Sequence, residues 1–154
     1  MAYKNVDAGV LGYLGRALSM EMSAVQQYLT LSRLLRLRGF EEIAAHFQQE
    51  ANEELAHSDR IIGRMLVLGV APNMTQLRPA RLGESLPELM ASAEELEKDI
   101  VSLYQQAVAH CRSINDFDNH LFFNELLQEE QEHVGKLSNW QNRFFERKPD
   151  NHSD

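Results

Sequence analysis

Two short segments of the sequence repeat the same pair of potential metal ligands. Glu54 and His57 are three residues apart in EELAH, and Glu130 and His133 repeat this spacing in EEQEH. Positions i and i+3 share one face of an α-helix, so the two side chains of each pair can reach the same point. Carboxylate oxygen combined with imidazole nitrogen suits iron or manganese. On an exposed helix the same spacing is usually a pair of solvated side chains, so the pattern alone does not establish a metal site.

Two further glutamates extend each pattern by the same distance. Glu21 precedes Glu54 by 33 residues, and Glu97 precedes Glu130 by 33 residues. Four glutamates and two histidines are therefore expected to meet inside the protein. Four buried carboxylates repel one another and cannot all remain ionised without compensating positive charge, which two divalent cations would supply. The sequence thus predicts a centre for two metal ions, and the redox-active interpretation is a di-iron carboxylate centre.

Long segments rich in Leu, Glu, Ala and Gln contain almost no proline or glycine and therefore predict four helices. Asp7 is expected to cap the first helix, and Ser85 with Glu88 is expected to form a capping box at the start of the third. The predicted helices span residues 7–38, 41–68, 85–114 and 116–146, with approximate boundaries. A polar tail at 147–154 follows, and the whole chain is expected to form a single domain.

The short connections between these helices set the height of the candidate ligands. Glu21 and His57 each lie 18 residues from a hinge at Gly39. With a rise of about 1.5 Å per residue, they reach the same level on adjacent antiparallel helices. Glu97 and His133 have the same relation to a second hinge at residue 115. The longer connection between the second and third helices predicts a crossover along a four-helix bundle.

The composition excludes several classes of protein. A chain of 154 residues with 44% hydrophobic and 25% charged residues is typical of one soluble globular domain. Its single cysteine excludes an intrachain disulfide framework or a thiolate zinc cluster. The net charge of −8 disfavours nucleic acid or an anionic membrane as a partner. We find no signal peptide and no apolar run long enough to span a membrane, and therefore expect a cytoplasmic protein.

Three segments resemble the bacterioferritins: LSMEMSAVQQY (18–28), EELAHSDRIIGRML (53–66) and EEQEHVGKL (129–137). The resemblance runs from about residue 6 to residue 146 and implies an all-α, ferritin-like four-helix bundle with one long crossover between helices two and three. It implies that all six ligand positions are present: Glu21 and His57 for one iron, Glu97 and His133 for the other, with Glu54 and Glu130 as bridges. It further implies oxidation of Fe(II) by O2 or H2O2 and storage of Fe(III) within a shell of 24 subunits.

Two departures from the bacterioferritin pattern modify these expectations. The family binds haem at a dimer axis through a Met placed directly after the bridging Glu of helix two, and Leu55 occupies that position here. Leucine cannot ligate iron, so we expect no Met-ligated haem. The family also carries a short fifth helix that lines the four-fold channels, and the tail at 147–154 is not expected to form one. The chain is then expected to build a shell with wider openings, to co-assemble with a complete sister bacterioferritin, or to remain a small oligomer.

Other residues have weaker claims to a role. Tyr28 follows Glu21 by seven residues and is a candidate hydrogen-bond donor or one-electron relay beside the metals. Tyr104 follows Glu97 in the same way, but we favour a purely structural hydrogen bond for it. Glu50 and Glu53 could guide iron, although a solvated helix face is the simpler interpretation. Helix one is apolar nearly all round, which predicts a homodimer through helices one and two.

The interpretation that best accounts for the six ligands is a haem-free ferroxidase that supports iron storage. One alternative is a di-iron oxidase or peroxidase that stores nothing. The rubrerythrin type is disfavoured, because its iron–thiolate module needs four cysteines. Another alternative is a metal-poor structural subunit that co-assembles with a sister bacterioferritin chain, against which the complete ligand set argues.

Overall fold

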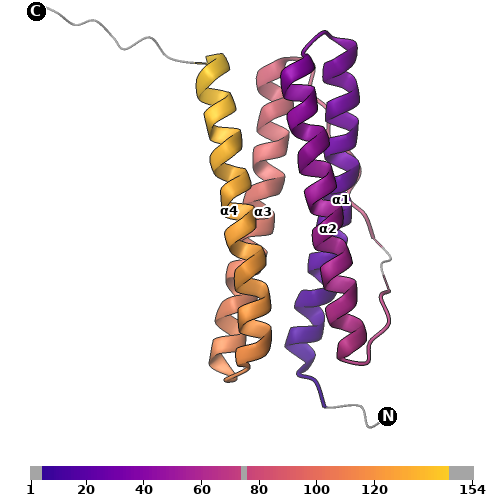
Figure 1. Cartoon of the computed structure of the whole chain (residues 1–154), viewed down its shortest axis with the longest axis vertical. Coiled ribbons are helices and arrows are strands. Elements are labelled where there is room, and N and C mark those ends of the chain that lie inside the picture. Colours follow the sequence, from indigo (N-terminus) through magenta and orange to yellow (C-terminus); the bar gives the residue numbers. More distant parts are fainter. Residues whose placement is uncertain (1–4, 74–75, 146–154) are drawn as a thin grey trace, which may run out of the picture.

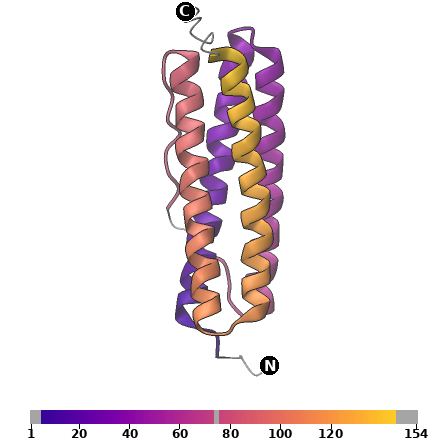
Figure 2. The same cartoon turned by 90° about the vertical axis from the view of Figure 1, so that its left-hand side faces the viewer.

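Four long helices make up the protein in a computed structural model that describes residues 5–73 and 76–145. They run side by side along the long axis of the molecule (Figure 1, Figure 2). Within the described ranges there is no strand, which confirms the all-α four-helix bundle. The predicted tail at 147–154 lies outside the described residues. The helices are α1 (Ala8–Leu37), α2 (Glu41–Val67), α3 (Leu86–Ser113) and α4 (Phe117–Phe145).

Local signals in the sequence begin and end these helices. The Asp7 carboxylate accepts a hydrogen bond of 3.0 Å from the backbone N–H of Val10, which satisfies one free donor at the start of α1. Ser85 and Glu88 form the predicted capping box at the start of α3. Gly39, with φ of 85°, adopts the left-handed conformation that ends α1 and turns the chain into α2.

The two hairpins, α1–α2 and α3–α4, pack against each other chiefly through α1 and α3. Between them, residues 68–73 and 76–85 run back along the bundle (Figure 1), and α2 and α3 point in the same direction. Gln27 on α1 holds this crossover by accepting a hydrogen bond from the Arg81 backbone N–H and donating one to its carbonyl, each 2.7 Å long. The Ser23 hydroxyl accepts a third bond, 2.9 Å long, from the backbone N–H of Arg78.

Large aromatic side chains fill the core next to the candidate ligands. Tyr28 and Phe47 have ring centroids 5.8 Å apart, and Tyr104 and Phe123 form a similar pair at 6.3 Å. All four side chains are fully buried. Both members of the first pair precede their counterparts by 76 residues, which is also the offset between the two Glu-x-x-His segments. The two hairpins therefore repeat core packing as well as potential ligands.

Helices α1 and α2 leave several apolar side chains outside the core. Leu31 and Leu35 are buried, whereas Leu29, Leu37 and Leu55 are 43%, 78% and 53% exposed. The expected second apolar face of α1 is thus present at the exposed Leu29 and Leu37, whereas Leu31 and Leu35 belong to the core. Within the described ranges, no helix is long and apolar enough to cross a membrane.

Candidate metal centre

The middle of the bundle concentrates acidic side chains. Among the described residues, the buried carboxylate and basic side chains are five glutamates and two histidines, with no aspartate, lysine or arginine. Buried carboxylates without a cationic partner carry a large desolvation cost unless they bind protons or metal ions. The seven residues are Glu21, Glu50, Glu54, His57, Glu97, Glu130 and His133.

One group of potential ligand atoms surrounds His57. Oxygen atoms of Glu21, Glu54 and Glu130 lie with a ring nitrogen of His57 within 4.8 Å of one another. The Nδ1 atom of His57 is 2.9 Å from Glu130 Oε1 and 3.5 Å from Glu21 Oε1. The short α1–α2 turn is what places Glu21 and His57 at the same level, since each lies equally far from Gly39.

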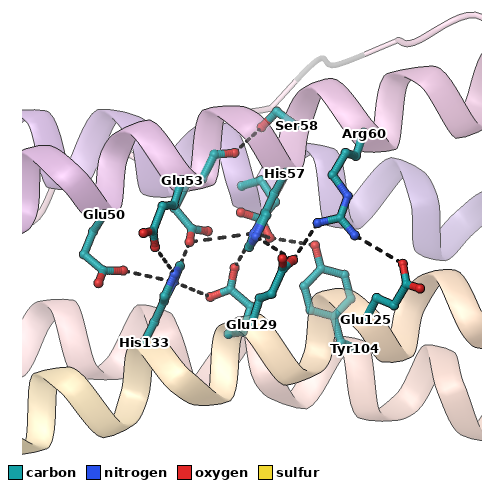
Figure 3. Close-up of polar contacts among 12 residues, drawn as sticks. Glu50, Glu53, His57, Ser58, Arg60, Tyr104, Glu125, Glu129 and His133 are labelled. Carbon is teal, nitrogen blue, oxygen red and sulfur yellow. Dashed lines mark hydrogen bonds and ion pairs between the residues drawn. The ribbon is translucent and has the colours of Figure 1, made fainter.

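A second group surrounds His133. Glu50, Glu53 and His133 also offer ligand atoms within 4.8 Å of one another. The Nδ1 atom of His133 is 2.8 Å from Glu54 Oε1 and 2.9 Å from Glu50 Oε2. Glu50 and Glu53 point from α2 toward His133 on α4 (Figure 3), and Glu53 contacts its Nε2 atom.

Glu97 is the one predicted ligand that belongs to neither group. Its side chain is fully buried, and within the described residues neither carboxyl oxygen has a hydrogen-bond partner. Burial, followed by the nearby charge of Glu50, raises the pKa of Glu97 to about 8. A buried carboxyl group with two unpartnered oxygens is available to bind a cation.

Burial and mutual contacts shift the pKa values of several side chains in this cluster. Burial and the charge of Glu21 raise the pKa of Glu54 well above its usual value. Burial also opposes ionisation of Glu130, but contacts with His133 and His57 outweigh it and lower the pKa of that carboxyl. Burial likewise opposes the charge on His57, yet contacts with Glu130 and Glu21 raise its pKa to about 10. Metal ligation requires neutral imidazole and ionised carboxylate, so a metal must displace these protons.

The outer faces of both histidines contact carboxylates that are partly exposed. Glu129 Oε2 lies 3.1 Å from His57 Nε2 and 2.5 Å from an Arg60 nitrogen. Glu53 makes the equivalent contact with His133 from the other helix, so the two contacts cross between α2 and α4 (Figure 3). Such outer carboxylates fix the ring orientation of a ligating histidine. Here they leave Nδ1 of each ring facing the inner glutamates.

The two buried tyrosines differ in their contacts with the candidate ligands. The Tyr104 hydroxyl donates a hydrogen bond of 2.6 Å to Glu21 Oε1. The Tyr28 hydroxyl has no hydrogen-bond partner within the described part of the chain, and burial with the charge of Glu97 raises the pKa of Tyr28 well above its usual value. The sequence favoured Tyr28 over Tyr104, whereas the structure gives the direct contact to Tyr104.

Comparison with known proteins identifies the family of this chain. The sequence model of the ferritin-like domain matches residues 11–144. A bacterioferritin of Rhodobacter capsulatus is 34% identical over 131 residues, which cover 85% of this chain and 81% of that protein. This chain is a member of the bacterioferritin family. A bacterioferritin of Brucella melitensis is 30% identical over 128 residues, covering 83% of this chain and 80% of that protein. One of Mycobacterium avium is 28% identical over 131 residues, covering 85% and 82%.

The burial of Glu50 in this bacterioferritin differs from the sequence interpretation, which favoured a solvated position. Glu50 is 1% exposed. It precedes Glu54 by four residues, so both side chains lie on the same face of α2. The four-residue spacing from Glu54 could have indicated that Glu50 faces the bundle interior. The polar residues around Glu50 favoured a solvated helix face instead.

A pocket of about 240 Å³ between α2 and α4 connects this bacterioferritin's buried cluster with the surface. Both histidines line it, together with three partly or fully exposed glutamates. Acidic groups along an opening raise the local concentration of cations. The full lining is Glu53, Ala56, His57, Arg60, Glu129, Glu132, His133 and Lys136.

Proposed function

We propose that this bacterioferritin is a ferroxidase that oxidises Fe(II) with O2 or H2O2 and supports iron storage. The observation that carries the proposal is the set of buried glutamates and histidines, which contains no buried lysine or arginine among the described residues. Two iron ions per chain would supply the missing positive charge. The proposed ligands are Glu21, Glu54, His57, Glu97, Glu130 and His133.

Glu54 and Glu130 are proposed to contact both metals. Glu54 Oε1 is 2.8 Å from His133 Nδ1 and 3.9 Å from His57 Nδ1. Glu130 Oε1 is 2.9 Å from His57 Nδ1, while its Oε2 is 3.4 Å from His133 Nδ1. Each carboxylate thus lies within 4 Å of both inward-facing histidine nitrogens, which supports the proposed bridging role. Glu21 and Glu97 are proposed to complete the two positions from α1 and α3.

The reaction uses Fe(II) as its substrate and takes one electron from each of two ions. With H2O2, two electrons and two protons yield two molecules of water; with O2, they yield H2O2. The protein contributes by holding both ions together, so that a two-electron acceptor meets two donors at once. Tyr104 is proposed to keep the Glu21 carboxylate oriented toward His57 through its hydrogen bond.

Removal of Glu130 tests the proposed site. We expect Glu130→Ala to lose the fast phase of Fe(II) oxidation, because its carboxylate contacts both histidines. Glu125→Ala, an exposed position on the same helix that does not line the pocket at the histidines, is the matched control and should retain the fast phase. Circular dichroism would establish that both variants fold. Wild-type oxidation by Glu130→Ala would refute the assignment.

Storage requires an assembly as well as a reactive centre. We propose a homo-oligomer built from dimers through α1 and α2, where Leu29, Leu37 and Leu55 are exposed. Twenty-four copies of 17.7 kDa would give about 425 kDa by light scattering. A shell should also take up far more than two irons per chain. Iron uptake limited to two would instead indicate a non-storing oxidase or peroxidase, and an isolated chain without iron would indicate a structural subunit of a mixed shell.

We further propose that the protein binds no Met-ligated haem. Leu55 occupies the position that follows Glu54 on α2, and its side chain is 53% exposed. A thioether sulfur can ligate haem iron, whereas an aliphatic side chain offers no lone pair. A haem absorption spectrum of the bis-Met type in protein purified from haem-replete cells would contradict this proposal.

A further inference from the structure

The two halves of the centre match at many positions but differ next to His133. An offset of 76 residues relates Glu53 to Glu129 and Tyr28 to Tyr104. The same offset relates Glu50 to Leu126, which is also fully buried. One half of the centre therefore contains a carboxylate where the other half contains an aliphatic side chain.

Glu50 is placed as a ligand would be. Its Oε2 atom lies 2.9 Å from His133 Nδ1, the same nitrogen that is 2.8 Å from Glu54 Oε1. Glu50 is 1% exposed, and its Oε2 atom has no hydrogen-bond partner of good geometry within the described residues. Figure 3 shows its side chain reaching from α2 to His133 on α4. A buried carboxylate oxygen aimed at the inner face of a ligating histidine is suited to share a metal with it.

His46, which precedes Glu50 by one helical turn, does not account for the burial of the Glu50 carboxylate. His46 Nε2 is 3.7 Å from Glu50 Oε1, beyond hydrogen-bond distance, and has no hydrogen-bond partner among the described residues. The His46 ring packs against Phe47 and Trp140, with centroids 5.3 Å and 5.7 Å away. His46 therefore makes no hydrogen bond to the Glu50 carboxylate on that side.

We propose that Glu50 is a seventh ligand, which serves only the metal ion held by His133. This inference rests on the proposed function and deepens it, because it makes the two metal positions unequal. The position at His133 has one more carboxylate than the position at His57, where Leu126 stands in the equivalent place. Additional negative charge strengthens binding of a divalent ion. The His133 position is therefore the tighter of the two.

Titration with Co(II) tests the inference, because cobalt reports its coordination by visible absorption and does not require catalytic turnover. Wild-type protein should bind two Co(II) ions per chain with different affinities. Glu50→Gln, which keeps the shape of the side chain, should weaken the tighter site by about tenfold or more and leave the weaker one within about twofold. Glu42→Gln, an exposed position on α2 outside both ligand groups and outside the pocket at the histidines, is the matched control and should change neither affinity. Glu50→Asp keeps the charge but shortens the reach, and should weaken the same single site.

The outcomes separate this inference from the proposed function. If wild-type protein binds two Co(II) ions and Glu50→Gln binds both equally well, Glu50 is not a ligand. An equal loss at both sites would also overturn the inference, because it would indicate a general structural effect. If wild-type protein binds no pair of Co(II) ions, the proposed function fails and the role of Glu50 fails with it.

Discussion

Glu97→Gln is expected to stabilise the metal-free protein while weakening metal binding. Both carboxyl oxygens of Glu97 are buried without a hydrogen-bond partner in the described structure. The folded protein therefore favours the protonated carboxyl, whose pKa is raised from 4.5 to about 8. Glutamine has nearly the same shape and never carries the charge. The variant should thus remove a destabilising ionisation together with a metal ligand.

The magnitude follows from the shift in pKa. At about 1.4 kcal/mol per unit, a change from 4.5 to about 8 corresponds to a ceiling of roughly 5 kcal/mol. Between these pH values Glu97 binds more protons in the folded state than in the unfolded state. The contribution of Glu97 to the free energy of unfolding therefore falls as the pH rises. The buried amide of glutamine needs partners of its own, which reduces the net gain to about 1–3 kcal/mol. For a chain of this size, that gain raises Tm by roughly 3–10 °C.

Thermal unfolding in the presence of a chelator measures this effect. The difference in Tm between Glu97→Gln and wild type should be small near pH 5 and should grow until about pH 8, with the variant more stable. Glu95→Gln, an exposed position on the same helix, should change stability by less than about 0.5 kcal/mol. A Glu97→Gln variant that is less stable than wild type at pH 8, or whose advantage does not depend on pH, would refute the electrostatic reasoning.

Three other predictions follow from particular contacts. Tyr104→Phe removes the hydrogen bond to Glu21 and should weaken one metal site by about tenfold in a Co(II) titration; an unchanged affinity would exclude a positioning role. Metal binding should release protons and strengthen as the pH rises from about 6 toward 10, because His57, with a pKa of about 10, must become neutral. Calorimetry in buffers of different ionisation enthalpy measures the proton release. A metal affinity that does not depend on pH would contradict this prediction. Gln27→Ala removes two hydrogen bonds to Arg81 and should lower the free energy of unfolding by about 1–3 kcal/mol in urea, whereas no change would show that the crossover is held by other contacts.

The sequence predicted those parts of the fold that depend on local signals. Asp7 and the Ser85–Glu88 box cap helices through interactions between neighbouring residues, so their effect can be read from the chain itself. The level of Glu21 and His57 depends only on helix rise and one short turn, and the two side chains do meet at 3.5 Å.

Other features depend on how the two hairpins pack, which helix rise does not determine. Glu97 lies equally far from its hinge as His133, yet its carboxylate joins neither ligand group. Glu50 lies beside His133 instead. Tyr104 contacts Glu21 across the interface between α1 and α3, so its partner belongs to the other hairpin. Spacing along each helix placed both tyrosines beside the glutamate seven residues before them, so it could not show that Tyr104 reaches Glu21 on the other hairpin.

The most direct test of the proposed ferroxidase is the stoichiometry of rapid Fe(II) oxidation. Stopped-flow absorbance would follow metal-free protein mixed with increasing Fe(II) in the presence of O2, and separately of H2O2. The structure predicts a fast phase that saturates at two Fe(II) per chain with at least one of these oxidants and disappears in Glu130→Ala. Oxidation that rises with added iron without saturation, at a rate shared by wild type and Glu130→Ala, would contradict a di-iron ferroxidase centre in this chain.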